Sequence, residues 1–460
     1  MRFFDRESEM EALEKRYSSD SFEFFILYGR RRVGKTELIK EFCRDKPHIY
    51  HLFSQDTEKR QRERLARSIA EYFDEPEPKL EGWRETVEYI GGKLEQEKIV
   101  LALDEFPYAI ESEESLPSQF QYLVDEILKE DSESMIVLSG STVSVMLDDV
   151  LGYESPLYGR RTGQIDLKPF RFKESLEVID YSIEDAVRSY TVTGGTPMYL
   201  TSFDYSKSLD QNIRDEILDA SSALFEEPEF LLRQELRQPS RYFSILESIA
   251  NGYTTPNEIS NNTGISSGTM PQYLKKLQKL RLIERTTPVT SSKKTKRSIY
   301  NIKDNFIRFW YRNIHSQKSM VEENPEKAAE NIISGLNHQV AETFEQICHE
   351  TVQKAGEYTK VGRWWYQEDE IDVVALDEQE NKILLGEVKW TNQKVGEKLL
   401  RQLEEKTEKV QWKNQDREEN FALFSKNGFT RGLQEKAEQR KDLELHNLEE
   451  IGKKLEMEEP

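Results

Sequence analysis

The chain of 460 residues is long enough for about two to four domains, and its 36% of hydrophobic and 10% of aromatic residues exclude a wholly disordered protein. The formal net charge of −21 excludes nucleic-acid binding over the whole surface but is compatible with a local basic module. Two cysteines, Cys43 and Cys348, are too few for a disulfide framework or a cysteine-rich zinc site. The N-terminus is charged almost at once, and every apolar run is far shorter than a membrane span. We therefore expect a soluble, cytoplasmic protein without a membrane partner.

Short apolar runs alternate with helical patterns in the first part of the chain. Residues 24–28, 49–53, 99–103 and 135–138 are predicted to be buried strands, and residues 36–44 and 58–73 are predicted helices. Alternation of this kind is typical of an α/β fold with a parallel sheet covered on both faces.

The segment GRRRVGKT fits the phosphate-loop pattern G-x-x-x-x-G-K-[ST]. It follows a predicted strand and begins a predicted helix, and this context disfavours a chance match. Gly29 and Gly34 let the backbone N–H groups turn toward a phosphate, where the helix N-terminus adds positive potential. Lys35 is expected to reach the β- and γ-phosphates, and the Thr36 hydroxyl is expected to bind Mg²⁺.

The apolar strand at residues 99–103 ends in an Asp-Glu pair, as a Walker B motif does. Asp104 is predicted to hold Mg²⁺ through water, and Glu105 is predicted to polarise the attacking water. The strand at residues 135–138 leads into Ser139 and Ser141, of which either can contact the γ-phosphate; a plain strand-to-helix turn explains them nearly as well.

A compact basic turn, PLYGRRT, contains Arg160 and Arg161. Either arginine is a candidate to contact the γ-phosphate, within its own chain or in trans in a homo-oligomer. A solvated arginine pair is an equally good interpretation, because arginines are mostly exposed.

Residues 241–315 carry 13 basic and 4 acidic residues, a net charge of +9 that leaves −30 on the rest of the chain. Three helical patterns and a basic hairpin predict a winged helix-turn-helix, with residues 241–300 contacting DNA. Its third helix offers Thr269, Gln272 and Tyr273 to base edges, and its wing offers Lys293, Lys294, Lys296 and Arg297 to phosphates or a minor groove. A module that contacts an unknown protein partner is the alternative.

Two apolar strand patterns near the C-terminus carry Asp372 and the Glu387-x-Lys389 pair. Glu387 and Lys389 are two residues apart and therefore project from one face of a strand. This is the D…E-x-K pattern of PD-(D/E)XK nucleases, in which Asp372 and Glu387 would hold Mg²⁺ and Lys389 would orient or deprotonate water. Glu345 is a candidate additional carboxylate. A bare D…E-x-K pattern is weak, because such residues are common on exposed hairpins.

The motifs FDRExE at residues 4–9, GRRRVGKT, LALDEF, LSGS, SPLYGRRT and GGTPMYL occur in this order and resemble the archaeal ATPase family, a branch of the AAA-like, STAND-type P-loop NTPases. The resemblance covers about the first half of the chain. It implies ATP as the nucleotide, with residues 4–7 near the adenine ring, although core packing of Phe3 and Phe4 is as good an interpretation.

Many members of that family carry a restriction-endonuclease-like C-terminal domain with a signature similar to GRWW…EID…GE-K-W. Here Ile371 stands where that signature has proline before the aspartate. The expected architecture is thus an ATPase core at residues 1–168, a helical lid at 169–237, a winged helix-turn-helix at 238–315, a linker near 316–327 and a nuclease-like α/β domain at 328–460. We expect an ATPase that acts on DNA; the alternative is a nucleotide-driven regulatory or defence switch that binds DNA or a protein without cleavage.

Overall fold

The computed structural model describes residues 3–129, 132–236, 238–292, 295, 297–414 and 416–456. The chain divides into two compact units, with the boundary between Pro169 and Phe170. Within the described residues, no helix is both long and apolar enough to cross a membrane.

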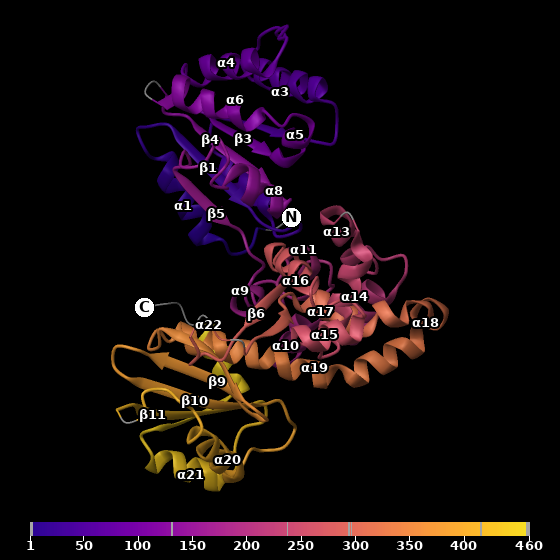
Figure 1. The fold of residues 1–460 in the computed structure, drawn as a ribbon, viewed down its shortest axis with the longest axis vertical. Helices are drawn as coiled ribbons and strands as arrows, with labels where there is room; N and C mark the ends of the chain where they lie inside the picture. The colour runs from indigo at the N-terminus through magenta and orange to yellow at the C-terminus, as the bar shows by residue number, and fades with distance from the viewer. Residues whose placement is uncertain are drawn as a thin grey trace. The chain divides into compact units, whose positions relative to one another are not determined.

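The first unit is built on a sheet of five parallel strands, in the order β2-β3-β4-β1-β5 (Figure 1). Four of these strands are the predicted ones, which confirms the parallel α/β core. β5 lies outside the predicted strands, because its sequence GQID is short and polar and it pairs with β1 at the sheet edge. The strands are β1 (Glu23–Tyr28), β2 (His48–Leu52), β3 (Val100–Asp104), β4 (Met135–Gly140) and β5 (Gly163–Asp166).

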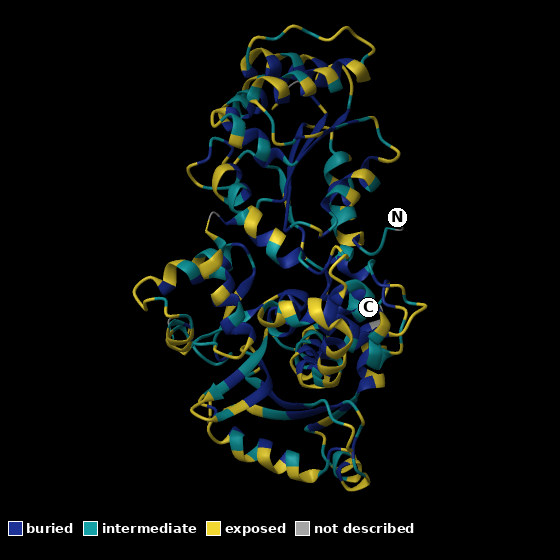
Figure 2. Cartoon of the chain, turned by 90° about the vertical axis from the view of Figure 1, so that its right-hand side faces the viewer, coloured by how far each residue is buried: buried dark blue, intermediate teal, exposed yellow. Residues whose placement is uncertain are grey.

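Successive residues of a strand point to opposite sides of the sheet, so these apolar strands place apolar side chains on both faces. Helices cover both faces. Phe24 and Ile26 of β1 belong to one apolar core, and Phe25 and Leu27 belong to the other. Figure 2 shows these strands as buried, with the exposed residues on the outer sides of the helices. The first core includes α3 (Glu58–Tyr72), α4 (Trp83–Leu94), α5 (Phe106–Ser112), α6 (Leu116–Tyr122), η1 (Leu123–Leu128) and η2 (Met146–Val150), which follows α8 (Val143–Val145); the second includes α1 (Glu7–Tyr17) and α2 (Lys35–Cys43).

The second unit begins with the helical segment predicted as a lid. Gly195 approaches the chain so closely that a Cβ atom there would lie 1.7 Å from the Phe170 carbonyl oxygen, which explains the glycine in the GGTP motif. The longest helix of the segment, α10, packs on two later helices, α17 (Asn305–Asn313) and α19 (Pro325–Lys354). The segment comprises α9 (Phe172–Ser175), α10 (Ile183–Thr193), α11 (Pro197–Leu200), α12 (Leu209–Asn212), η3 (Ile213–Leu218) and α13 (Glu227–Glu235).

Three helices and a two-stranded antiparallel sheet follow; we call them the helix–hairpin module (residues 239–302). The second helix begins with a capping box, in which Thr255 Oγ1 accepts a hydrogen bond from the Glu258 N–H and the Glu258 carboxylate accepts one from the Thr255 N–H. The third helix begins at Met270 and follows Thr269 as its N-cap residue. The elements are α14 (Pro239–Ala250), α15 (Pro256–Thr263), α16 (Met270–Lys279), β6 (Ile283–Thr286) and β7 (Ile299–Ile302).

The expected linker near residues 316–327 is wrong, because this stretch is helical. It contains η4 (His315–Gln317) and α18 (Lys318–Glu323), and α19 (Pro325–Lys354) begins within it. Asn324 caps α19 by accepting a hydrogen bond from the Lys327 N–H, and Pro325 occupies the first helical position. The charged composition resembles a linker, but Val321 and Ala328 are buried.

A mixed five-stranded sheet forms the C-terminal part of the second unit, in the order β12-β11-β10-β9-β8. β8, β9 and β10 are antiparallel neighbours, and β10, β11 and β12 run parallel. Helix α19 contacts β8, β9 and β10, and α20 contacts β9 and β10. The elements are β8 (Lys360–Tyr366), β9 (Asp369–Asp377), β10 (Lys382–Lys389), α20 (Glu397–Thr407), β11 (Glu418–Ser425), α21 (Arg431–Gln439), β12 (Leu443–Asn447) and α22 (Leu448–Glu456).

Candidate functional site

The predicted phosphate loop connects β1 to α2. A Cβ atom on Gly29 would lie 2.3 Å from the Leu167 carbonyl oxygen, so this position requires glycine. Gly34 has a φ of 94° and forms the N-cap of α2, a conformation that other residues rarely adopt. Lys35 is buried, and its ammonium group donates to the carbonyl oxygens of Gly29 and Arg30, both at 3.0 Å. The Lys35 ammonium group therefore lies against the loop backbone that would surround a bound phosphate.

Asp104 lies fully buried at the end of β3, next to the start of α2. Thr36 Oγ1 donates to Asp104 Oδ2 at 2.7 Å, which brings together the two residues predicted to bind Mg²⁺. The Tyr50 hydroxyl on β2 donates to the same oxygen at 2.9 Å. Burial and the Asp104 carboxylate raise the pKa of Tyr50, so the hydroxyl remains a donor. Sequence reasoning missed Tyr50, because nothing in its own strand pattern identifies its partner.

Glu105 has a left-handed backbone (φ 54°) that turns its side chain toward the end of β4. Its carboxylate accepts hydrogen bonds from the Ser141 hydroxyl and from the Ser141 backbone N–H, the latter at 3.2 Å. Ser139, one of the two serines predicted to contact the γ-phosphate, is buried on β4, and within the described part of the chain its hydroxyl has no hydrogen-bond partner. The structure thus brings Ser141, rather than Ser139, into contact with Glu105.

Arg160 is held by an acidic partner within the first unit. Its Nε lies 2.8 Å from Asp125 Oδ2, and its Nη1 donates to the Pro156 carbonyl at 2.7 Å. Arg161 is half-exposed. The predicted role of these arginines at the γ-phosphate stays a prediction.

The residues predicted to contact DNA lie on the helix–hairpin module. Thr269 and Gln272 are exposed at the start of α16. Tyr273 is half-buried, and its hydroxyl accepts a hydrogen bond from Arg241 at 2.6 Å. Arg297 is exposed in the hairpin, whereas Lys293, Lys294 and Lys296 lie outside the described residues.

The second candidate site lies at the neighbouring ends of β9 and β10. Asp372 and Glu387 are both buried, Glu387 to 2% exposure. The Lys389 ammonium group lies 2.9 Å from Glu387 Oε2 and 3.6 Å from Asp372 Oδ2, and the Val388 N–H donates to that Asp372 oxygen at 2.9 Å. Burial alone would lower the pKa of Lys389, but Asp372 and Glu387 raise it above its usual range. The structure therefore brings the three predicted residues together.

Three residues that sequence reasoning missed surround this site. Lys406 on α20 lies 2.5 Å from Glu387 Oε1, so that carboxylate is placed between two lysines. His349 on α19 donates from Nε2 to the Asp372 carbonyl at 2.7 Å, and burial lowers its pKa to about 4. Arg363 on β8 lies 2.7 Å from Glu345 Oε1. Burial, opposed by Arg363, raises the pKa of Glu345 to about 8.

The phosphate loop and the buried Asp104 beside Glu105 define the class of the first unit, which is a Walker-type P-loop ATPase core. A family model for an ATPase domain found predominantly in Archaea matches residues 3–203, and a second model, for archaeal and bacterial proteins of unknown function, matches residues 310–409. The solved Walker-type ATPase of Pyrococcus abyssi has 23% identity and a TM-score of 0.53, with 67% of this chain and 96% of that one covered, and so shares its fold.

Two proteins of Methanocaldococcus jannaschii are similar in sequence. An uncharacterised protein is 37% identical over 405 residues, which cover 85% of this chain and 88% of the relative. An uncharacterised ATP-binding protein is 50% identical over 44 residues, 10% of this chain and 75% of its own length. The chain therefore belongs to the family of archaeal ATPases, and the nucleotide that the family implies is ATP.

Proposed function

We propose that this ATPase acts on DNA, which it binds through the helix–hairpin module as a winged helix and cleaves at the site around Asp372. The observation that carries the proposal is the meeting of Asp372, Glu387 and Lys389 at one end of the mixed sheet, with the ammonium group within 3.6 Å of both carboxylates. The basic balance of residues 241–315 within an acidic chain supports DNA as the substrate.

In the first unit, the chain offers a complete set of groups for ATP and Mg²⁺. The narrow turn at Gly29, the positive φ of Gly34 and the buried Lys35 fit a triphosphate, and Thr36 with Asp104 would hold the cation. When bound, Mg²⁺ neutralises charge that develops on the phosphates. Glu105 would orient water once its carboxylate is free of Ser141.

In the mixed sheet, Asp372 and Glu387 offer buried carboxylate oxygens, the ligands that a hard divalent cation prefers. Such a cation would supply Lewis-acid stabilisation of a phosphodiester undergoing hydrolysis. Lys389, half-exposed beside both carboxylates, would hold the attacking water or the scissile phosphate. Val388 fixes the orientation of Asp372 through its backbone N–H.

The test is Mg²⁺-dependent cleavage of linear and supercoiled DNA, with and without ATP, by the wild type and by Asp372→Asn. The isosteric change removes the charge but keeps an acceptor for Val388, so the fold should persist while cleavage falls at least ~100-fold. Asp377→Asn, at the other end of β9, is the matched control and should cleave like the wild type. Cleavage that survives in Asp372→Asn would remove the nuclease assignment.

A second candidate function is a nucleotide-driven switch that binds DNA or a protein without cutting. The observation that favours it is the pairing of Glu387 with both Lys389 and Lys406, which offsets the buried charge without any metal. This alternative would be supported by footprints on DNA that change with ATP, provided that no condition gives cleavage.

A further inference from the structure

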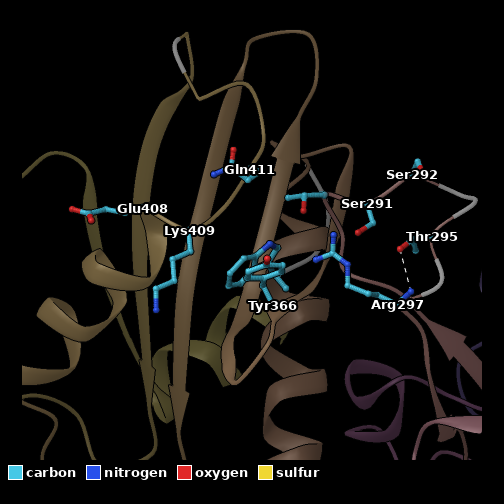
Figure 3. A pocket seen from close by; sticks show the side chains of 10 residues that line it. Ser291, Ser292, Thr295, Arg297, Tyr366, Glu408, Lys409 and Gln411 are labelled. Atoms are coloured by element: carbon cyan, nitrogen blue, oxygen red, sulfur yellow. Dashed lines mark hydrogen bonds between the residues drawn. The ribbon is translucent and has the colours of Figure 1, made fainter. Parts of the chain in front are cut away.

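A hollow of about 660 Å³ lies between the hairpin loop of the helix–hairpin module and the mixed sheet. Ser291, Ser292, Thr295 and Arg297 line it from the loop, and Tyr366 and Lys409 line it from the sheet side. Figure 3 shows Tyr366 between Lys409 on one side and Arg297 on the other. Both walls belong to the second compact unit.

The loop wall is attached to the sheet by its base. The Val289 N–H donates to the Arg363 carbonyl at 2.9 Å, and the Val289 side chain packs against the apolar core of the mixed sheet. The β8–β9 register shifts between Gly362 and Trp364, so Arg363 lies outside the regular ladder. The same bulged residue therefore binds the loop through its carbonyl and Glu345 through its guanidinium group.

The lining has the chemistry of a nucleotide site. Four Ser and Thr hydroxyl groups, the Arg297 guanidinium and the Lys409 ammonium are donors suited to phosphate oxygens, and Glu408 also lies in the lining. Tyr366 is 43% exposed and presents its ring to the hollow, with the Arg297 guanidinium carbon 5.2 Å from the ring centroid. An exposed aromatic ring beside cationic groups is the arrangement on which unpaired bases stack. The volume lies in the range of about 300–1,000 Å³ that small ligands occupy, so it suits an unpaired nucleotide and not a duplex.

The hollow also leads to the candidate cleavage site. Lys409 lies 2.7 Å from Asp369 on β9, and Lys406, three residues earlier at the end of α20, lies 2.5 Å from Glu387. The Lys409 N–H donates to the Lys406 carbonyl at 3.0 Å, which fixes the spacing of the two lysines. Asp369 precedes Asp372 by three residues of an extended strand, or roughly 10 Å. A single strand of DNA held at Tyr366 would thus pass Lys409 and Lys406 before it reaches Asp372.

We propose that this hollow binds an unpaired segment of the DNA, and that the preferred substrate is a duplex with a single-stranded extension. The inference rests on the proposed action on DNA and deepens it by naming the class of substrate. The base stacks on Tyr366, and Arg297 and the loop hydroxyls bind its phosphate.

The test measures binding without divalent metal, by fluorescence anisotropy, so that it does not depend on cleavage. The probes are a blunt duplex and the same duplex with an oligothymidylate extension on either strand. We expect the wild type to prefer an extended probe, and Tyr366→Leu to weaken binding of that probe by roughly 5- to 100-fold with little effect on the blunt duplex. Tyr366→Phe keeps the ring and should keep the preference. Tyr72→Leu is the matched control, because Tyr72 is 38% exposed and lies on α3 of the first unit, outside both the hollow and the helix–hairpin module.

Arg297→Gln provides a second variant, which should weaken the extended probe more than the blunt one. Three results would each overturn the inference: an equal loss of affinity for both probes in the variants, no loss of affinity in Tyr366→Leu, or a wild type that does not prefer the extended probe. Absence of cleavage together with a preference that depends on Tyr366 would remove the nuclease while the hollow stands. Cleavage that requires Asp372 but does not depend on Tyr366 would keep the nuclease and remove the hollow as a binding site.

Discussion

In the parallel sheet, Asp104 accepts hydrogen bonds from the hydroxyl groups of Thr36 and Tyr50 and from the Glu105 backbone N–H, all of them neutral donors. In the mixed sheet, Glu387 lies between the ammonium groups of Lys389 and Lys406, at 2.9 and 2.5 Å. Neutral donors orient a carboxylate but leave its charge to attract a cation, whereas lysines offset that charge. We therefore expect an added cation to stabilise the site around Asp104. The site around Glu387 should remain folded without a cation.

The largest expected effect tests the charge of the phosphate loop. Lys35→Ala removes the ammonium group that lies against the Gly29 and Arg30 carbonyls, so ATP hydrolysis should fall at least ~100-fold. Phosphate release and binding of a labelled ATP measure the effect. Lys40→Ala, an exposed lysine on the same helix, is the control and should behave like the wild type. Hydrolysis at the wild-type rate in Lys35→Ala would disprove the phosphate site.

The second prediction concerns a buried carboxyl group of the second unit. Burial, together with Glu174, raises the pKa of Glu350 from 4.5 to about 7, although the Phe172 N–H and Arg171 lower it. With the folded-state pKa raised, this group contributes stability at pH values below about 4.5 that is lost as pH rises to about 7. Glu350→Gln removes this loss, so the variant should gain roughly 1–3 kcal/mol of unfolding free energy over the wild type between about pH 5 and pH 8.

Thermal unfolding across that pH range measures the difference between Glu350→Gln and the wild type. Glu330→Gln, at an exposed position of the same helix, is the control and should give a difference that does not change with pH. A flat difference for Glu350→Gln as well would mean that its carboxyl group ionises alike in the folded and unfolded states.

Sequence patterns were sufficient where the signal is local. The phosphate loop, its Asp-Glu partner and four of the five parallel strands are each encoded within a few consecutive residues. The D…E-x-K triplet also follows from the alternation of strand side chains. These features need no knowledge of which distant segment packs against them.

Contacts between distant segments had no such signal. Tyr50 meets Asp104 because β2 and β3 are neighbours, and Lys406 meets Glu387 because α20 packs on β10. The guanidinium group of Arg160 binds Asp125, 35 residues away, a partner that the basic turn does not indicate. Segment 316–327 is helical because Val321 and Ala328 are buried, a consequence of packing that its charged composition hides.

The third prediction tests the cationic surroundings of the mixed-sheet site. Lys406→Met removes one of the two ammonium groups that offset Glu387, so the affinity for a divalent cation should rise roughly tenfold. Titration of the thermal shift with Mn²⁺ or Mg²⁺ measures it, and Lys398→Met, exposed on the same helix, is the control. If Lys406→Met bound the cation no better than the wild type, the lysine would not compete with the metal.

The smallest expected effect concerns Glu105, whose carboxylate is held by hydroxyl and backbone donors rather than by lysines. In the first unit, Ser141 holds Glu105 through its hydroxyl and its backbone N–H, so the carboxylate is not free to orient water. Ser141→Ala removes the hydroxyl and leaves the weaker backbone contact, and a hydrogen bond to a charged group is worth about 1.5–3 kcal/mol. The retained backbone contact keeps about half of that energy, so basal ATP hydrolysis should rise roughly three- to tenfold, with little change in KM. Ser112→Ala, which removes a hydroxyl bound to the Ala109 carbonyl, is the control. A fall in the hydrolysis rate of Ser141→Ala would instead mean that Ser141 acts with Glu105, on the nucleotide, and does not restrain it.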